Sequence, residues 1–305
     1  MSVDSRSDFP RALITGLQGF TGRYLCAELQ AAGYQVFGTA HTSEELCTNS
    51  FKVDLRDRTE LDRVVREVNP DVVAHLAAIS FVAHGDAEAI YQTNVVGTRN
   101  LLEALSGLAV RPRAVLLASS ANIYGNAAVE VIDESVVARP ANDYAVSKLA
   151  MEYMATLWSD KLPIVIARPF NYTGVGQTEL FLLSKIVSHY RRRAEKIELG
   201  NLDVSRDFCD VRAVAYAYRR LLQACPIGET VNICAGRAYS LRDALHLASS
   251  ITQHKMRVEV NPAFVRAHEV KTLKGDPSKL RKLIGYWEPP SLEETLRWML
   301  NEGQE

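Results

Sequence analysis

The N-terminal part of the chain places a glycine-rich turn between an apolar strand candidate and an amphipathic helix candidate. Residues 11–15 are a short apolar run, and the segment GLQGFTG follows at 16–22. Apolar residues then recur at helical spacing from Tyr24, and Gly33 marks a helix stop. Glycine permits a tight turn, a close backbone approach to a pyrophosphate and close packing of helix on strand. This order predicts a dinucleotide-binding unit with the phosphates at the helix N-terminus.

Strand and helix candidates alternate behind this unit. Short apolar runs predict strands at 35–40, 51–54, 71–76, 114–118 and 164–167. Residues 57–68 predict a helix, because Asp57 and Glu60 occupy capping-box positions before one apolar stripe. Asn94 is expected to open another helix that continues through Leu105, and His75 is expected to be a packed histidine rather than a catalyst. The alternation predicts an α/β protein with a Rossmann-type doubly wound parallel sheet.

The length of 305 residues allows a full α/β domain and a smaller partner. In the second half, helices are expected near 179–193, 210–224, 241–251 and 292–298, with a strand at 230–233. No linker or repeat separates the two halves, so we expect a smaller C-terminal α/β substrate domain interleaved with the first. The expected dinucleotide-binding domain is 9–170, with returning segments near 207–237, and the expected substrate domain is 171–206 with 238–305.

Composition excludes several classes of function. The formal net charge is -1, which provides no general field for nucleic acid or an anionic membrane. The polar N-terminus lacks the apolar centre of a signal peptide, and no apolar run approaches the roughly 18 residues of a membrane helix. Five scattered cysteines show no metal-ligand spacing. We therefore expect a cytoplasmic protein without a metal, a membrane partner or a nucleic-acid partner.

Tyr144 and Lys148 are the leading catalytic candidates. They are four residues apart, so on a helix they share one face, and the ammonium favours the phenolate form of the tyrosine. Ser120 follows the strand candidate 114–118, and ligands in open α/β sheets lie at the carboxyl ends of strands. A Tyr-x-x-x-Lys pair alone is more often a solvated helix face, but the nucleotide-binding pattern before it favours catalysis.

Five motifs in this order resemble the extended short-chain dehydrogenase/reductases, the class that modifies nucleotide-activated sugars. They are TGxxGFxG at 15–22, Leu76-Ala77-Ala78, NVVGT at 94–98, Ser119-Ser120 before Tyr124-Gly125, and Tyr144-xxx-Lys148. The resemblance spans almost the whole chain. It implies that Tyr144 transfers a proton, that Lys148 tunes it and binds the nicotinamide ribose, and that Ser120 hydrogen-bonds the reacting oxygen.

The resemblance also implies a nicotinamide cofactor. Residues 38–42 read GTAHT, where NAD-selective sites place a carboxylate, so we expect a weak preference for NADPH with NADH as the alternative. The resemblance places Asp54 at the adenine and three glycines at the pyrophosphate. The expected cofactor contacts are Gly16, Gln18, Gly19, Phe20, Gly22, His41, Thr42, Asp54, Leu55, Leu76, Ala77, Ala78, Asn94, Tyr144, Lys148 and Arg168.

The C-terminal half is most similar to the GDP-mannose branch of this class. The similarity rests on three segments: RPFNYTGVGQ at 168–177, GNL at 200–202 with RDF at 206–208, and GDPSKL at 275–280. The likeness implies a GDP-4-keto-6-deoxy sugar as the substrate. The expected substrate contacts are Ser80, Ser120, Ala121, Asn122, Asn171, Lys185, Arg206, Arg266 and Glu269.

One residue departs from the 4,6-dehydratases of that branch. They carry a glutamate two residues after the position of Ser120, and this chain has Asn122, which cannot exchange a proton. The expected reaction is therefore NAD(P)H-dependent reduction of the 4-keto group of GDP-4-dehydro-6-deoxy-D-mannose to GDP-D-rhamnose. The alternatives are an epimerase or 4,6-dehydratase of the same class and a non-catalytic dinucleotide-binding protein. Apolar side chains on more than one face of the helices after Asn94 and around 144–158 predict a homodimer. They include Ala145, Val146, Leu149, Met151, Met154 and Leu157.

Overall fold

The computed structural model describes residues 9–41, 49–80, 85–127, 129–264 and 271–302. The chain divides into two compact units. The first comprises the residues up to Ser119, Asn142–Ala167 and Ala215–Val231, and the second comprises Ser120–Ala141, Arg168–Val214 and the residues from Asn232 on. Residues 120–141 thus fall in the second unit, whereas the sequence places them in the dinucleotide-binding domain. The expected functional domain boundaries stay a prediction.

A seven-stranded sheet has the spatial order β10-β6-β5-β4-β1-β2-β3. The register of the pairings from β6 to β3 is parallel throughout. This is the strand order of a doubly wound Rossmann sheet, with its switch point between β1 and β4, so the expected fold class is confirmed. The strands are β1 (Arg11–Thr15), β2 (Gln35–Ala40), β3 (Ser50–Lys52), β4 (Val72–His75), β5 (Ala114–Ala118), β6 (Ile164–Pro169) and β10 (Thr230–Ile233).

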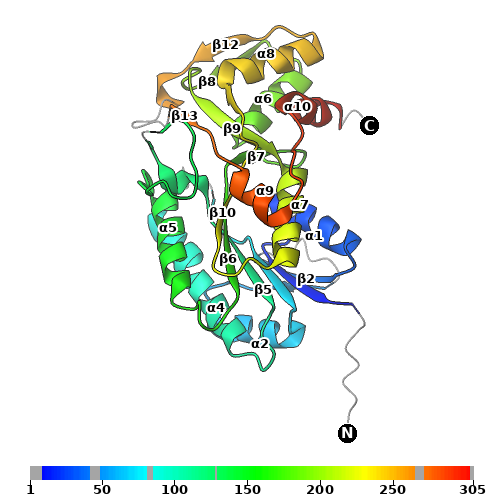
Figure 1. Ribbon diagram of the computed structural model, residues 1–305. Helices are drawn as coiled ribbons and strands as arrows, with labels where there is room; N and C mark the ends of the chain where they lie inside the picture. The colour runs from blue at the N-terminus through cyan, green and yellow to red at the C-terminus, as the bar shows by residue number, and fades with distance from the viewer. Residues whose placement is uncertain (1–8, 42–48, 81–84, 128, 265–270, 303–305) are drawn as a thin grey trace. The chain divides into compact units, whose positions relative to one another are not determined.

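Helices pack on both faces of this sheet in the first unit (Figure 1). α2 (Arg58–Val68), α4 (Thr98–Ser106) and α5 (Asp143–Thr156) cover one face, and α1 (Phe20–Ala31) lies against β1 and β2 on the other. The apolar stripes of α2, α4 and α5 form one buried core with the strands, and each large side chain in it contributes about 1.5–3 kcal/mol. The core includes Leu13, Leu61, Val64, Val73, Leu101, Leu102, Val115, Leu117 and Met151.

Two helix beginnings differ from the expectation. Asp57 does accept the backbone N–H of Glu60 at 3.0 Å, but the Glu60 carboxylate pairs with Arg63, so only half of the capping box forms. The helix expected to open at Asn94 begins earlier, as α3 (Ala87–Tyr91), and passes through a π-helical turn, η1 (Gln92–Gly97), before α4. Such π turns occur often at functional sites.

The second unit contains two smaller sheets under helices. One has the order β11-β9-β13 with β7 also paired to β9, and the other pairs β12 with β8. α6, α8 and α10 pack together over a separate apolar core that includes Leu183, Ile186, Leu245 and Leu296. The strands are β7 (Asn171–Thr173), β8 (Lys196–Leu199), β9 (Ser205–Asp210), β11 (Ala238–Ser240), β12 (Arg257–Val260) and β13 (Thr272–Leu273). The helices are η2 (Ala121–Tyr124), α6 (Leu182–Arg191), α8 (Leu241–Thr252), η3 (Pro262–Phe264), α9 (Ser278–Ile284) and α10 (Leu292–Asn301), while α7 (Val211–Ala224) begins in this unit.

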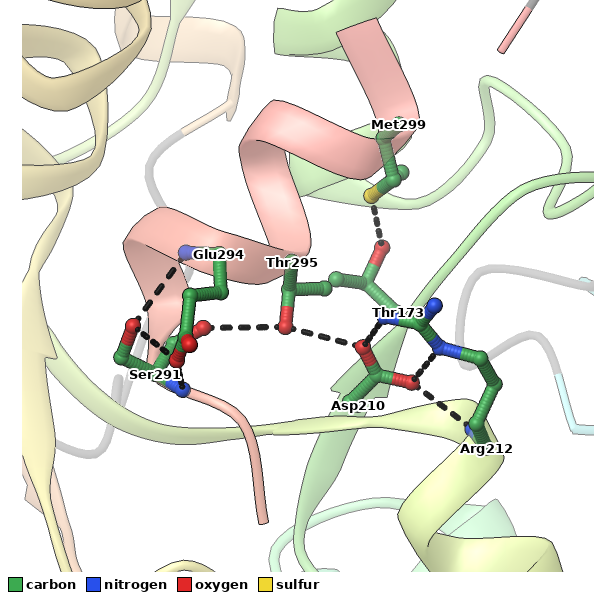
Figure 2. Close-up of polar contacts among 7 residues, drawn as sticks. All are labelled: Thr173, Asp210, Arg212, Ser291, Glu294, Thr295 and Met299. Atoms are coloured by element: carbon green, nitrogen blue, oxygen red, sulfur yellow. Dashed lines mark hydrogen bonds and ion pairs between the residues drawn. The ribbon is translucent and has the colours of Figure 1, made fainter. Parts of the chain in front are cut away.

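A buried carboxylate fixes α10 to the end of β9 (Figure 2). Asp210 is fully buried and accepts hydrogen bonds from the Arg212 guanidinium at 2.7 Å and from the Thr295 hydroxyl at 3.0 Å. Ser291 begins α10 with a complete capping box, because its hydroxyl and its backbone N–H both bond to Glu294. The capping box gives partners to N–H groups that have none within the helix, and Thr295 and Arg212 give partners to the buried Asp210 carboxylate.

Within the described ranges, no helix is long and apolar enough to cross a membrane. The same part of the chain holds no group of three or more His, Cys, Asp or Glu side chains arranged to bind a metal ion.

Candidate active site

The catalytic candidates Tyr144 and Lys148 lie on α5, as the spacing predicts. Asn142 caps this helix by accepting the backbone N–H of Ala145 at 2.9 Å. The side chains of Tyr144 and Lys148 share the buried face, and the Lys148 Nζ lies 6.0 Å from the centre of the Tyr144 ring. The structure therefore excludes a solvated helix face at these two residues.

Lys148 is held by the carboxyl end of β5. Its ammonium donates a hydrogen bond to the backbone carbonyl of Ala118 at 2.7 Å. Burial lowers the pKa of Lys148 to about 8, and the nearby Glu152 carboxylate opposes that shift. A buried cation beside a phenol can stabilise negative charge on the phenol oxygen during proton transfer.

Ser120 caps the short helix η2. Its hydroxyl accepts the backbone N–H of Asn122 at 3.2 Å, and the residue is buried. It belongs to the second unit, whereas Tyr144 and Lys148 belong to the first. Ala121 is buried beside it in the chain, and Asn122 is exposed.

The glycine turn packs closely against other backbone, so that side chains have no room at two of its glycines. Gly16 has a φ of +72°, and a Cβ there would lie 3.0 Å from the Ala77 backbone. A Cβ on Gly22 would lie 2.3 Å from the Gly16 carbonyl oxygen. α1 begins after Gly19 with no side-chain cap, so its first N–H groups carry the positive end of the helix dipole. Gln18 and Phe20 stand in the same turn. The residues present thus fit a dinucleotide.

Hydrogen bonds between polar side chains join the carboxyl ends of β1 and β4. Thr98 donates to the Asn94 carbonyl at 2.7 Å, so its oxygen accepts from His75 Nε2 at 2.8 Å. His75 Nδ1 then accepts from the Thr15 hydroxyl at 2.7 Å. Burial, with a smaller effect of the Lys148 charge, lowers the pKa of His75 to about 3. His75 is therefore a neutral, packed histidine, as expected.

Asn94 is buried and uses its whole amide. Its oxygen accepts the Ile79 N–H at 2.9 Å, and its nitrogen donates to the Ile79 carbonyl at 3.1 Å and to the Ser147 hydroxyl at 3.0 Å. The loop after β4, with Leu76, Ala77 and Ala78, is therefore tied to η1 and α5. Ser80, next along this loop, is exposed.

The other expected cofactor contacts in the first unit lie after β2 and β3. His41 is exposed directly after β2, and Thr42 falls outside the described residues. Asp54 accepts several hydrogen bonds from the Arg56 guanidinium, which lower the pKa of the carboxyl. Leu55 is buried in the core and packs against Gly97, so its side chain is structural.

The expected substrate contacts that are described lie in several elements of the second unit. Lys185 donates to the Glu198 carbonyl at 2.8 Å and lies 4.7 Å from the Phe264 ring centre. Arg206 donates to the Ser205 carbonyl at 2.9 Å. Asn171 is exposed at the start of β7, and Arg266 and Glu269 fall outside the described residues.

Arg168, expected at the cofactor, also lies in the second unit. Its guanidinium donates to the Tyr124 hydroxyl at 2.8 Å, which in turn donates to Asn232 Oδ1 at 2.8 Å. Burial raises the pKa of Tyr124 to about 12, so this phenol stays protonated. Tyr124 is therefore a structural link between η2, β6 and β10.

Sequence reasoning missed Glu152, which is buried one helical turn beyond Lys148 and accepts the Ser119 hydroxyl. The spacing from Lys148 to Glu152 repeats that from Tyr144 to Lys148, and this was the available signal. It also missed Arg56, whose contact with Asp54 cannot be read from the two residues alone.

The chain matches the family model described as GDP-mannose 4,6 dehydratase over residues 13–299. It is 36% identical to the GDP-6-deoxy-D-talose 4-dehydrogenase of Aggregatibacter actinomycetemcomitans, over 90% of this chain and 91% of that protein. It is 34% identical to the GDP-6-deoxy-D-mannose reductase of Pseudomonas aeruginosa, over 96% of each chain.

Solved structures show the same similarity. A protein of Burkholderia cenocepacia J2315, assigned provisionally as an epimerase, is 54% identical, with a TM-score of 0.91 over 95% of this chain and 97% of that one. The RMD protein of Pseudomonas aeruginosa, solved in complex with NADPH, is 32% identical, with a TM-score of 0.83 over 96% of each chain.

Proposed function

Because the chain belongs to the GDP-mannose 4,6-dehydratase family, we propose that it reduces the 4-keto group of GDP-4-dehydro-6-deoxy-D-mannose to give GDP-D-rhamnose. The observation that carries the proposal is the buried Tyr144 and Lys148 pair on α5. Two relatives named for the oxidation or reduction of GDP-6-deoxy sugars support this substrate class.

The chain's own residues supply the proton and the binding groups. The phenol of Tyr144 donates its proton to the substrate's 4-keto oxygen, and the Ser120 hydroxyl donates a hydrogen bond to that oxygen. The Lys148 ammonium stabilises the phenolate that remains. The nicotinamide dinucleotide, when bound, supplies the hydride. The proton lost by Tyr144 is regained from solvent before the next turnover.

Gly16, Gly19 and Gly22 would hold the pyrophosphate against the start of α1. We propose NADPH as the cofactor, since the solved RMD structure holds NADPH and no carboxylate in 38–41 repels a 2′-phosphate. No arginine in that segment clamps the phosphate, so the preference is weak and NADH also serves. A kcat/KM for NADH more than about tenfold above that for NADPH would contradict this preference.

Asn122 separates this proposal from a dehydratase. An amide cannot accept and return the proton that elimination of water requires, and Asn122 is exposed. Asn171, Lys185 and Arg206 are the proposed contacts for the GDP-sugar in the described part of the second unit. A guanidinium such as that of Arg206 suits phosphate oxygens.

GDP-6-deoxy-D-talose is a second candidate product, favoured by the relative that is 36% identical. The two products differ in configuration at C4, so the ring face that receives the hydride decides between them. An epimerase would return the hydride and consume no cofactor, which separates it from both reductases.

The proposed enzyme is a homodimer that pairs through α5 and η1. Val146 on α5 is 37% exposed, Leu157 directly after α5 is 77% exposed, and Val96 on η1 is 40% exposed. Ala145 and Met151, which were expected on this surface, are instead fully buried within the first unit. The smaller apolar surface still supports association, and light scattering that finds a monomer at micromolar concentration would contradict it.

The test supplies GDP-4-dehydro-6-deoxymannose and NADPH, follows the absorbance of the reduced nicotinamide, and identifies the product's C4 configuration by NMR. Tyr144→Phe is expected to lose about 100-fold or more in rate while it keeps dinucleotide binding. Tyr153→Phe is the matched control, because Tyr153 lies on the same helix with 70% of its surface exposed. The proposal fails if the parent leaves the keto sugar unreduced or if Tyr144→Phe works at the parent rate.

A further inference from the structure

Three ionisable side chains form one buried row on α5. Tyr144, Lys148 and Glu152 follow one another at four-residue spacing, so each lies about one turn from the next. Their exposed fractions are 8%, 4% and 6%. A carboxylate buried beside the catalytic pair is costly unless it is paired or hydrogen-bonded, so its presence calls for a role.

Consecutive residues at the end of β5 hold the two charged members of the row. The Lys148 ammonium donates to the Ala118 carbonyl at 2.7 Å, and the hydroxyl of Ser119 donates to the Glu152 carboxylate. Both contacts lie within the first unit. The turn of chain that leads to Ser120 is therefore fixed to α5 at two adjacent points.

Within the described residues, the ionisable groups that face Lys148 come from two elements. On α5 these are Tyr144 and Glu152, and on β4 it is His75, which burial keeps neutral because its pKa falls to about 3. Burial lowers the pKa of Lys148, and in the described part of the chain Glu152 is the charged group that raises it. The carboxylate thus opposes the loss of the lysine's proton near neutral pH.

We propose that Glu152 is a positioning residue of the active site, which keeps Lys148 an ammonium ion beside Tyr144 and ties α5 to the end of β5 through Ser119. The inference rests on the proposed roles of Tyr144 and Lys148. Glu152 makes and breaks no bond itself. Without it the ammonium loses its proton at a lower pH, and Tyr144 then lacks the positive charge that offsets its phenolate.

The pH dependence of kcat/KM tests the charge of Glu152. Glu152→Gln keeps the shape and the hydrogen bond to Ser119 but removes the charge, so the alkaline limb of the profile is expected to move down by about one pH unit. A merely structural role would lower the rate by one factor at every pH. Ser119→Ala is the matched control, because it removes the hydrogen bond and leaves the charge, and its alkaline limb is expected to stay in place.

A second measurement needs no turnover. The ammonium of Lys148 is titrated by NMR in protein labelled with ¹⁵N-lysine, its signal being assigned from its loss in Lys148→Met. In Glu152→Gln this ammonium is expected to lose its proton at a lower pH than in the parent. Glu152→Asp retains the charge and is expected to titrate closer to the parent, which provides a test if the glutamine variant does not fold.

The inference would be overturned if the Lys148 ammonium in folded Glu152→Gln titrated as in the parent. It would also be overturned if the alkaline limb moved as far in Ser119→Ala as it does in Glu152→Gln. A parent protein that leaves the 4-keto sugar unreduced would instead overturn the proposed function. In that case the NMR titration still decides whether Glu152 keeps Lys148 charged.

Discussion

The side-chain amide of Asn94, in the π-helical turn η1, donates a hydrogen bond to the hydroxyl of Ser147 on α5 at 3.0 Å. Ser147 also donates to the Tyr144 carbonyl at 2.7 Å, so its hydroxyl is both donor and acceptor. Both residues are buried, at 1% and 0% exposure. The π turn is thereby fixed to the helix that carries Tyr144 and Lys148.

Ser147→Ala is expected to destabilise the protein by about 1–3 kcal/mol, because it leaves a buried amide N–H of Asn94 without its acceptor. Ser106→Ala is the matched control. Ser106 makes the same type of bond to a carbonyl three residues earlier, that of Glu103 at 2.9 Å, but it is only partly buried. Its replacement should cost less than about 1 kcal/mol. Denaturant unfolding measures the loss of stability in each variant, and equal losses in the two would contradict the role assigned to Asn94.

Gly16→Ala is expected to weaken dinucleotide binding, whereas Gly33→Ala is not. Both glycines have positive φ values, +72° and +84°, so both alanines carry a similar backbone strain of about 1–2 kcal/mol. Only at Gly16 would the new Cβ crowd the Ala77 backbone, at 3.0 Å, while nothing lies within 4 Å at Gly33. Fluorescence titration with NADPH measures the difference, and comparable affinities in the two variants would count against the proposed pyrophosphate site.

Stability is expected to fall in acid through His75. Its pKa is about 3 in the folded protein, below the ordinary 6.5, so the unfolded chain binds the extra proton. The effect is absent above pH 6.5 and grows as pH falls toward 3, reaching about 2 kcal/mol near pH 5. His75→Gln removes this dependence. Urea unfolding measures the free energy of unfolding of both proteins across this range. The difference between the parent and His75→Gln should narrow in acid, and a constant difference would refute the prediction.

Asp207 joins two loops of the second unit, the one after β10 and the one after β13, and is fully buried. Its carboxylate accepts backbone N–H groups from Ala235 and Gly236, each at 2.8 Å, and from Gly275 at 3.3 Å. Asp207→Ala leaves these donors unpaired, so a loss of about 3 kcal/mol is expected. Asp203→Ala, which removes an exposed ion pair with Arg242, should cost less than about 1 kcal/mol.

The loss of stability in Asp207→Ala should depend on pH. Burial raises the pKa of Asp207 to about 6, so the folded protein binds the proton more tightly than the unfolded chain. The stabilisation linked to that proton is complete below the ordinary value of 3.8 and is lost as pH rises through 6. The advantage of the parent over Asp207→Ala is therefore expected to shrink from acid to neutral pH. An advantage that grows over this range would show that the sign is wrong.

The local sequence pattern determined those strands, turns and helices that depend on residues close to one another in the chain. The run from Arg11 to Gly22 predicted β1, the glycine turn and α1, because a strand, a turn and a helix start each depend on neighbouring residues. The four-residue spacing of Tyr144 and Lys148 likewise determined their common face. Alternation of such segments predicted the parallel sheet.

Tertiary structure decided the contacts between distant residues. The π turn at Gln92–Gly97 forms where Gly97 packs against Leu55, and a side chain there would clash at 2.8 Å. The Asp207 carboxylate meets N–H groups 28, 29 and 68 residues away in the chain. No periodicity encodes such pairs, since they depend on how loops close. The pKa of Lys148 also depends on the tertiary structure. Burial lowers it and the Glu152 charge raises it, and both effects arise only when α5 packs against β5.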